Sequence, residues 1–476
     1  MGSKGALQGM LQEAWTPLEW LALVERELLL FAAVFFLIGA LDEFAMDLAW
    51  FWLRLTGRAR TMRIDRGSHI GRPLAGHAAL VIPAWREESV IGDTIAHALV
   101  AWPQDALRIY VGCYRNDPTT ARAIMAGAGD DPRVRLVVHD CDGPTTKADC
   151  LNRLYGAIEA DEARYGFDYR LVLLHDAEDA VDPAALSLLD AAIGLADFVQ
   201  IPVLPEPQVG SPFVGSHYCE EFAEAHGKAL VVRDAFGAAL PAAGVGCAFS
   251  RPILRRIAEE MDTAGPFSVE SLTEDYELGL KIEAAGGRSW FLRARGEDGR
   301  LVATRACFPA MLNQAVRQKA RWVHGIALQS WDRLGWSGGL FETWMRLRDR
   351  RGPLTSLVLF CAYAVFLLAP LLWLAGLVGL GRPWQPDGAV VVLLWANVAS
   401  FVWRTAMRVA FTAREYGLKQ GAWTVLRLPH ANLIAILAGR RAVAAYLATL
   451  LGARARWDKT QHYSHPVALL ARQGAG

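Results

Sequence analysis

Charge-free apolar stretches near both ends of the chain constrain its fold more than any other feature. Leu28 to Leu41 carries no charge, and after three acids the apolar sequence resumes as far as Leu53. About 20 apolar residues span a bilayer, so residues 28–55 are predicted to form a membrane helix whose acids face protein or the interface. The preceding segment, residues 1–27, does not resemble a signal peptide, because acids flank the apolar run and no small-residue cleavage site closes it.

Two further apolar runs lie in the last third of the chain. Neither Thr355 to Leu380 nor Gly388 to Trp403 contains a charged residue, and Asp387 directly precedes the second run. They predict a hairpin of two membrane helices over residues 353–411.

The final apolar stretch, residues 422–453, is interrupted by Pro429 and by Arg440-Arg441. We expect interfacial or re-entrant helices here, with a fourth crossing helix as the alternative. Residues 454–476 follow as a C-terminal tail.

Basic residues indicate the orientation of these segments. Clusters at Arg54–Arg66, Arg346–Arg351 and Arg404–Lys419 fall on one side of the membrane if the three main segments cross alternately. Lys and Arg are enriched on the cytoplasmic side, so we expect that side to hold the residues between the first and second segments.

The overall balance of residues excludes some classes of protein. The chain has 49 basic and 49 acidic residues and is 53% hydrophobic, unlike a disordered chain or a general nucleic-acid binder. Its seven cysteines include no CxxC pair, so we expect reduced thiols rather than a disulfide framework or a zinc ribbon.

Residues 74–335 alternate short apolar runs with helix-length amphipathic ones, which is typical of an α/β sheet domain. The predicted strands are Ala78–Ile82, Leu107–Gly112, Val134–His139, Tyr169–His175 and Phe198–Val203. The predicted helices are Ser89–Ala101, Thr119–Ala126, Lys147–Ala160 and Pro183–Leu195. In open α/β sheets, ligands bind beyond the carboxyl ends of the strands.

Polar residues gather where these strands end. They are Glu87 after the first strand, Asp117 after the second, Lys147 at the start of the third helix, and Asp176, Glu178 and Asp179 after the fourth strand. An acid after a strand is often only a helix cap. Several acids at one sheet edge, with Asp-x-Glu spacing, can instead hold a hard divalent cation that bridges phosphates.

Two later motifs also have both a structural and a functional interpretation. Thr273 can cap a helix whose first turn holds Glu274 and Asp275, or Asp275 can act as a general base. Gln318 and Trp322 share one face of a helix-like stretch, Phe308 to Trp331. Trp322 suits either the membrane interface or a sugar-stacking platform, and the neighbouring Arg321 has a guanidinium fork suited to diphosphate.

Over about residues 74–460 the chain resembles the membrane-bound, processive family 2 glycosyltransferases, which include the cellulose and hyaluronan synthases. The motifs that carry the resemblance are PxxxE at Pro83–Glu87, Lys147, the DxD-like Asp176–Glu178, TED at Thr273–Asp275 and QxxRW at Gln318–Trp322. Within this family it is similar to the bacterial phage-adsorption protein B (NfrB-like) type. That similarity rests on Asn116–Thr120, His175–Asp179, the RLPHAN run at Arg427–Asn432 and the terminal WDKTQH.

The resemblance implies a GT-A, Rossmann-like glycosyltransferase domain inserted between transmembrane helices, with an interfacial helix region. It assigns Asp275 as catalytic base with Glu274 beside it, and Mg²⁺ or Mn²⁺ to Asp176 and Glu178, with Asp179 as an alternative ligand. The nucleotide sugar would contact Glu87, Asp117, Lys147, Asp176, Gln318, Arg321 and Trp322. Two departures from the family pattern weaken the expectation of uracil recognition and of ordinary metal geometry: Gly112-Cys113 replaces an acidic pair, and Glu178 replaces Asp.

The implied function is inverting transfer from a nucleotide diphosphate sugar to a growing surface polysaccharide. The expected donor is UDP-linked, with an N-acetylated hexosamine as a candidate sugar. The implied location is the bacterial inner membrane, with the catalytic domain in the cytoplasm. The implied acceptor is a glycan or is lipid-linked. The implied partners are the membrane and an export protein of the outer membrane or periplasm, and no nucleic acid is expected. Two alternatives stay open. One is a single addition to a lipid-phosphate carrier, and the other is a non-catalytic membrane scaffold in a phage-receptor assembly.

Overall fold

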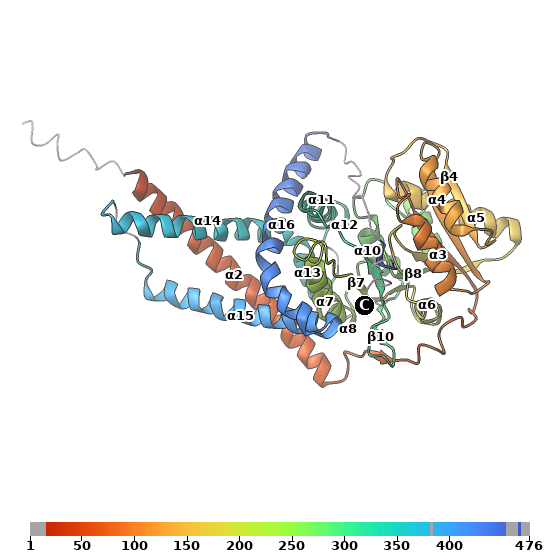
Figure 1. The fold of residues 1–476 in the computed structure, drawn as a ribbon, viewed down its shortest axis with the longest axis horizontal. Coiled ribbons are helices and arrows are strands. Elements are labelled where there is room, and N and C mark those ends of the chain that lie inside the picture. Colours follow the sequence, from red (N-terminus) through yellow and green to blue (C-terminus); the bar gives the residue numbers. More distant parts are fainter. Residues whose placement is uncertain (1–15, 337, 381–383, 454–464, 468–476) are drawn as a thin grey trace, which may run out of the picture. The chain divides into compact units, whose positions relative to one another are not determined.

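The computed structural model describes residues 16–336, 338–380, 384–453 and 465–467 (Figure 1). Expectations for residues 1–15, for most of the tail and for the WDKTQH motif lie outside this range. Two compact units separate within the described residues. One comprises the chain up to Ala45 with Leu354–Ala406, and the other comprises Met46–Pro353 with the chain from Met407 onward.

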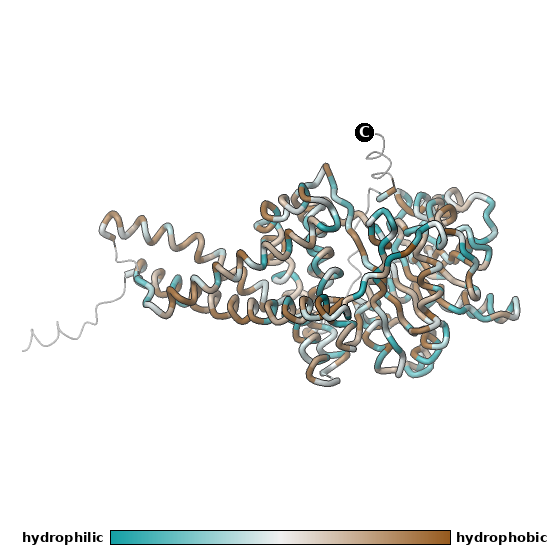
Figure 2. The backbone as a smooth tube through the Cα atoms, turned by 90° about the horizontal axis from the view of Figure 1, so that it is seen from below, coloured by the Kyte–Doolittle hydropathy of each residue, from teal (hydrophilic) through white to brown (hydrophobic). Residues whose placement is uncertain are grey.

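The first unit is built from long apolar helices, which are predominantly brown in the hydropathy view (Figure 2). It contains most of α2 (Pro17–Leu55), α14 (Gly352–Leu377) and α15 (Gly388–Tyr416). These three, and α16 (Leu418–Leu450) of the second unit, are the described helices long and apolar enough to cross a membrane. The predicted hairpin therefore consists of two helices, and the first helix begins earlier than its apolar run.

Two of the three acids that interrupt the apolar part of α2, Glu43 and Asp47, are buried. Glu43 forms an ion pair with Arg404 of α15 inside the first unit. Asp47, at the end of α2 that belongs to the second unit, lies 2.6 Å from the Lys228 ammonium, and both side chains are buried. Pairing offsets the high cost of a charge in an apolar setting.

A seven-stranded mixed sheet forms the centre of the second unit, in the order β4-β3-β2-β5-β8-β6-β9. β2 (His77–Pro83), β3 (Leu107–Tyr114), β4 (Val134–His139) and β5 (Tyr169–Leu174) are parallel, and β8 (Cys247–Ser250) runs antiparallel to both its neighbours, β5 and β6 (Phe198–Gln200). β9 (Ser289–Phe291) pairs with β6 in parallel.

Helices cover both faces of this sheet, and alternate strand residues pack into two separate cores. Leu80 of β2 belongs to one apolar cluster and its neighbour Val81 to the other, and both are buried. Strands buried on both faces read as continuous apolar runs, which is why the sequence revealed them. The covering helices are α3 (Ile91–Ala101), α4 (Pro118–Ala128), α5 (Lys147–Tyr165), α6 (Ala185–Ile193), α9 (Arg251–Met261) and α10 (Glu274–Ala284).

The fifth predicted strand, Phe198–Val203, is divided. β6 ends at Gln200, and after Ile201-Pro202 the chain continues as β7 (Val203–Pro205), which pairs with β11 (Thr304–Ala306) in a separate two-stranded sheet. Pro202 has no N–H for a strand ladder, so the sheet changes there. β1 (Met62–Arg63) and β10 (Ala294–Arg295) form another two-stranded sheet.

The remaining helices form a layer that carries the QxxRW motif. They are α7 (His217–Glu224), the π-helical turn η1 (Ala225–Ala229), α8 (Leu230–Ala235), α11 (Leu312–Trp322), the π-helical turn η2 (Val323–Gln329), α12 (Ser330–Leu334) and α13 (Leu340–Arg350). The predicted stretch Phe308–Trp331 is therefore helical from Leu312 onward.

α16 corrects the expectation of helices interrupted at Pro429 and Arg440-Arg441, because it is one continuous helix through both. Ala438 and Ala442 pack against Ala320 of α11, and the buried Arg427 guanidinium lies 3.2 Å from the Glu220 carboxylate of α7. Proline removes one helical hydrogen bond, and tertiary packing here outweighs that loss. Whether α16 crosses the membrane stays a prediction.

Candidate active site

The antiparallel course of β8 brings its start to the sheet edge where β5 ends. Leu174, the last residue of β5, pairs with Cys247, the first residue of β8. Asp176 therefore follows β5 at the same edge at which Gly244 to Gly246 lead into β8. The carboxyl ends of β2, β3 and β4 share that edge because these strands are parallel to β5.

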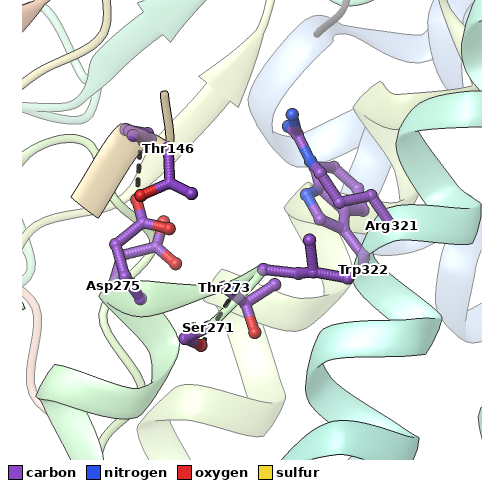
Figure 3. Close-up of a pocket in the computed structure, with 9 residues that line it drawn as sticks. Thr146, Ser271, Thr273, Asp275, Arg321 and Trp322 are labelled. Carbon is purple, nitrogen blue, oxygen red and sulfur yellow. Dashed lines mark hydrogen bonds and ion pairs between the residues drawn. The ribbon is translucent and has the colours of Figure 1, made fainter. Parts of the chain in front are cut away.

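A pocket at this edge joins three segments far apart in the sequence (Figure 3). Its lining consists of Thr146 and Lys147 at the start of α5, the run from Ser271 to Asp275 at the start of α10, and Arg321 with Trp322 at the end of α11. Figure 3 shows Asp275 on one side of the pocket with Arg321 and Trp322 across from it.

Lys147 connects two of the predicted acids. Its Nζ lies 2.6 Å from Asp176 Oδ1 and 3.8 Å from Glu274 Oε1. Burial opposes the charge of this ammonium, but Asp176 and then Glu274 hold the pKa of Lys147 above its ordinary value. Lys147 is therefore a fixed positive charge beside Asp176, of the kind that a diphosphate would meet.

Glu274, which is buried, and Asp275, which is half-buried, form an acidic pair at the first turn of α10. Burial, reinforced by the neighbouring charge of Asp275, raises the pKa of Glu274 to about 7. Burial also raises the pKa of Asp275, against the opposing charge of Lys147. Thr273 stands at the cap position, but its side chain makes no capping hydrogen bond. A carboxylate with a raised pKa is a stronger base, which suits proton abstraction.

Gly244 makes room for Asp275, and the sequence analysis missed it. A Cβ at Gly244 would lie 2.0 Å from Asp275 Oδ2, and the backbone there has φ of +76°. Both the space and the conformation therefore require glycine at this position. The signal in the sequence is the pair of glycines, Gly244 and Gly246, directly before a strand.

The QxxRW residues lie together at the end of α11. Gln318 is buried, and its Oε1 has no hydrogen-bond partner among the described residues. Trp322 is half-buried and packs in tilted or edge-to-face geometry against Tyr218, Phe222 and Phe308. Trp322 therefore lines the pocket, and its role as a sugar-stacking platform stays a prediction.

The three predicted metal ligands are not equivalent. Asp176 has 34% of its side chain exposed, whereas Asp179 is 1% exposed and its Oδ2 accepts from the Asp176 N–H at 2.9 Å and lies 3.0 Å from His175 Nδ1. Glu178 is buried. Within the described residues, the three carboxylates do not place one oxygen each within 4.8 Å of one another. The donor chemistry fits a hard divalent cation at Asp176, while Asp179 is engaged elsewhere.

Asp117 has a structural role that the sequence left open. Its Oδ1 accepts from the Thr120 N–H at 3.3 Å, which caps α4, and its Oδ2 accepts from the Arg86 N–H at 2.6 Å. The latter bond supports Arg86 at φ of +53°, an uncommon conformation for a side-chain-bearing residue. The adjacent Glu87 is buried, and its N–H donates to Thr120 Oγ1 at 3.0 Å. Asp117 therefore shapes the turn that presents Glu87.

Residues 75–325 match the model of the "Glycosyltransferase like family 2". The chain belongs to this family. The mixed sheet with its helical layers is accordingly a GT-A-like α/β fold, as the sequence predicted. The chain is also 34% identical over 460 residues to "Bacteriophage adsorption protein B" of Escherichia coli K12 and to "Bacteriophage N4 adsorption protein B" of Escherichia coli O157:H7. The matches cover 90% of this chain and 61% of each relative, so the chain spans less than two thirds of their length.

Solved structures show more distant likeness. A mannosyltransferase from Pyrobaculum calidifontis, in complex with GDP-Man and Mn²⁺, is 16% identical with a TM-score of 0.47, covering 85% of this chain and 99% of that one. A glucosyl-3-phosphoglycerate synthase from Mycobacterium tuberculosis, with Mn²⁺, UDP and phosphoglyceric acid, is 18% identical with a TM-score of 0.33, covering 56% and 81%.

Proposed function

We propose that this chain is an inverting, membrane-bound glycosyltransferase that moves a sugar from a nucleotide diphosphate sugar onto a growing surface polysaccharide. The observation that carries the proposal is the pocket itself, in which a cation, two adjacent carboxylates, a guanidinium and an indole converge from three distant segments. A scaffold that had lost its chemistry would have no need to keep the carboxyl group of Glu274 buried beside the half-buried Asp275.

Asp275 is the proposed base. It would take the proton from the acceptor hydroxyl as that oxygen attacks the anomeric carbon from the face opposite the leaving diphosphate, which inverts the configuration. Trp322, across the pocket, would stack on the acceptor ring and hold its hydroxyl in line. Gly244 keeps Asp275 at the pocket wall.

Lys147 and Arg321 are the proposed diphosphate ligands, with Gln318 beside them. Their charges would stabilise the negative charge that develops on the leaving group. Glu87 would lie by the base and ribose, and Asp117 would contribute there by shaping the turn that presents Glu87. Asp176 is the proposed site of Mg²⁺ or Mn²⁺, together with Glu178 of the same DxD-like motif. When bound, such an ion supplies Lewis-acid stabilisation of the diphosphate.

The proposed location is the bacterial inner membrane, with the glycosyltransferase domain in the cytoplasm. Support comes from the apolar helices α2, α14 and α15 and from the basic clusters at their ends. The names of the curated relatives suggest a product at the cell surface to which a phage adsorbs. A UDP-linked N-acetylated hexosamine is the proposed donor, and a partner in the periplasm or outer membrane would export the glycan.

The test is sugar transfer by the purified full chain in detergent or membranes. The protein receives a panel of radiolabelled UDP- and GDP-sugars with Mg²⁺ or Mn²⁺, and the products are separated by length. We expect one donor to label a polymer, and a single labelled addition to lipid would indicate the carrier alternative instead. Asp275→Asn should abolish labelling, because the amide cannot accept the proton.

The matched control is Asp105→Asn, which makes the same change at an exposed turn. It should leave transfer unchanged. If Asp275→Asn transfers as fast as the control, the assignment of the base is wrong. If no donor in the panel is consumed by the unmodified chain, the proposal of an enzyme fails and the scaffold alternative gains support.

A further inference from the structure

A second cluster of metal-ligating side chains lies at the end of β4, outside the pocket. His139 ends the strand, and Asp140 and Cys141 follow it. One ligand atom from each lies within 4.8 Å of the others, the one such group of three among the described residues. His139 Nδ1 is 3.2 Å from Cys141 Sγ and 3.5 Å from Asp140 Oδ1.

The nitrogen–sulfur and nitrogen–oxygen separations fit one ion of tetrahedral geometry, and the sulfur–oxygen separation is within 4.8 Å. Bonds of about 2.3 Å to sulfur and about 2.0 Å to nitrogen and oxygen would place sulfur about 3.5 Å from nitrogen and nitrogen about 3.3 Å from oxygen. The observed separations of 3.2 Å and 3.5 Å need only small adjustments, which the largely exposed Asp140 can supply.

Packing holds the ring of His139 beside a carboxylate of α5. Its ring is buried and stacks on Tyr114 with centroids 4.9 Å apart and planes at 5°. Its other nitrogen, Nε2, lies 3.3 Å from Asp149 Oδ2 in the first turn of α5. This contact lacks hydrogen-bond geometry, and Nε2 has no hydrogen-bond partner among the described residues. The second nitrogen of a metal-ligating histidine commonly donates to a carboxylate, and Asp149 offers one within reach.

Two arginines lie near the cluster. Arg153 lies 3.6 Å from Asp140 Oδ2, whereas the contact of Asp140 with His139 Nδ1 is through Oδ1. Arg115 pairs with Asp142 at 2.7 Å, and its charge also acts on Cys141 and Asp140.

We propose that His139, Asp140 and Cys141 bind a borderline transition-metal ion, of which Zn²⁺ is the natural candidate. Nitrogen, sulfur and oxygen together suit Zn²⁺, whereas Mg²⁺ and Mn²⁺ favour oxygen alone. Water would fill the fourth position. The ion joins the end of β4 to the start of α5 through Asp149, and so closes the loop that leads to Lys147. This site is separate from the proposed cation at Asp176 and does not depend on the proposed function.

Cys141 provides a direct readout, because it is the one cysteine of the seven that is not buried. The purified full chain is stripped with a chelator and treated with iodoacetamide, with or without added Zn²⁺, and each cysteine peptide is quantified by mass spectrometry. We expect Cys141 to be alkylated in the chelator and protected by one equivalent of Zn²⁺, but not by Mg²⁺. A coordinated thiolate has its reactive electron pair engaged by the metal.

Asp140→Asn tests the oxygen ligand, and Asp142→Asn is its matched control, since Asp142 is also exposed but pairs with Arg115. Asp140→Asn should need more Zn²⁺ for the same protection, and Asp142→Asn should not. As a second measurement, Co²⁺ should give a thiolate charge-transfer band that Cys141→Ser abolishes. Equal alkylation with and without Zn²⁺, or a Co²⁺ band that survives Cys141→Ser, would overturn the proposal.

Discussion

The carboxyl ends of β5 and β4 lie at the same edge of one sheet but present different ligands. After β5, the buried His175 is engaged by Asp179, and the partly exposed ligand is the carboxylate of Asp176, which is paired to Lys147 at 2.6 Å. After β4 come an imidazole, a carboxylate and a thiol around one point. The parallel strands thus create positions for ligands, and the atoms offered at each position decide which ion suits it.

One loop connects the two strand ends. It leaves β4 at His139 and enters α5 at Lys147, the cation that contacts Asp176. Asp149, two residues into that helix, faces His139. The cluster after β4 therefore supports the loop, while the carboxylate after β5 faces the pocket, and the two strand ends should respond differently to the same kind of change.

The largest effect is expected from Asp176→Asn. Removing this carboxylate should lower transfer on the order of 10³-fold, because the diphosphate loses its cation ligand while Lys147 loses its partner. Zn²⁺ protection of Cys141 should be unchanged in the same variant. Measured with the radiolabelled donor, a loss of less than about tenfold would remove Asp176 from the site. Asp142→Asn, the same change at the end of the other strand, is the control.

A somewhat smaller effect is expected from Gly244→Ala, which changes the pocket without removing any functional group. The new Cβ would lie 2.0 Å from Asp275 Oδ2, so the carboxylate must move. A displacement of about 1 Å can cost about 10²-fold in rate, and we expect kcat to fall by about that factor. Gly237→Ala is the matched control, because Gly237 also has positive φ, +68°, but no atom within 4 Å of its Cβ. Equal losses in both variants would point to backbone strain alone.

Exchanging ions should separate the two strand ends with a smaller effect on rate. In protein stripped of metal by a chelator, Mg²⁺ or Mn²⁺ should restore transfer but leave Cys141 reactive. One equivalent of Zn²⁺ should instead protect Cys141 without restoring transfer. Cys141→Ser should then lower transfer only severalfold, since it loosens the loop but removes no group from the pocket. If Zn²⁺ alone restores full transfer, the two sites are not distinct in their metal preference.

The sequence predicted the pocket residues because simple rules govern where they lie. Continuous apolar runs revealed the parallel strands, and the strand-end rule placed Lys147 and Asp176 at one edge. The pocket also contains Asp275, Arg321 and Trp322, which the motifs had singled out. Membership of the glycosyltransferase family and the GT-A-like fold were confirmed, whereas the roles of the individual residues stay predictions.

Other features depended on tertiary contacts that no local pattern encodes. Asp179 looked equivalent to Asp176, but in the structure its oxygen is used by His175 and by the backbone of Asp176. α16 runs through Pro429 because α7 and α11 pack against it. The cluster at His139 was missed because its residues are consecutive, whereas metal sites are usually sought in the sequence as CxxC pairs of cysteines.

The smallest expected effect concerns acid stability, and it depends on the buried His226. His226 accepts from the Val203 N–H through Nδ1 at 3.0 Å, and burial, with the charge of Arg293, lowers its pKa from 6.5 to about 3. Between about pH 3 and pH 6.5, His226 is therefore protonated in the unfolded chain but neutral in the folded chain. The corresponding stability is fully present above about pH 6.5 and is lost as the pH falls toward 3. His226→Gln keeps a hydrogen-bond acceptor but cannot be protonated in this range. The temperature midpoint of unfolding, measured in detergent, should therefore fall less steeply between about pH 6.5 and pH 4 in this variant.

The slope should be reduced rather than abolished, since His217 also has a pKa lowered to about 3 by burial, reinforced by the charge of Lys319. The same substitution at the exposed His430 should leave the slope as it is, and an equal flattening there would show that His226 is not the group that titrates.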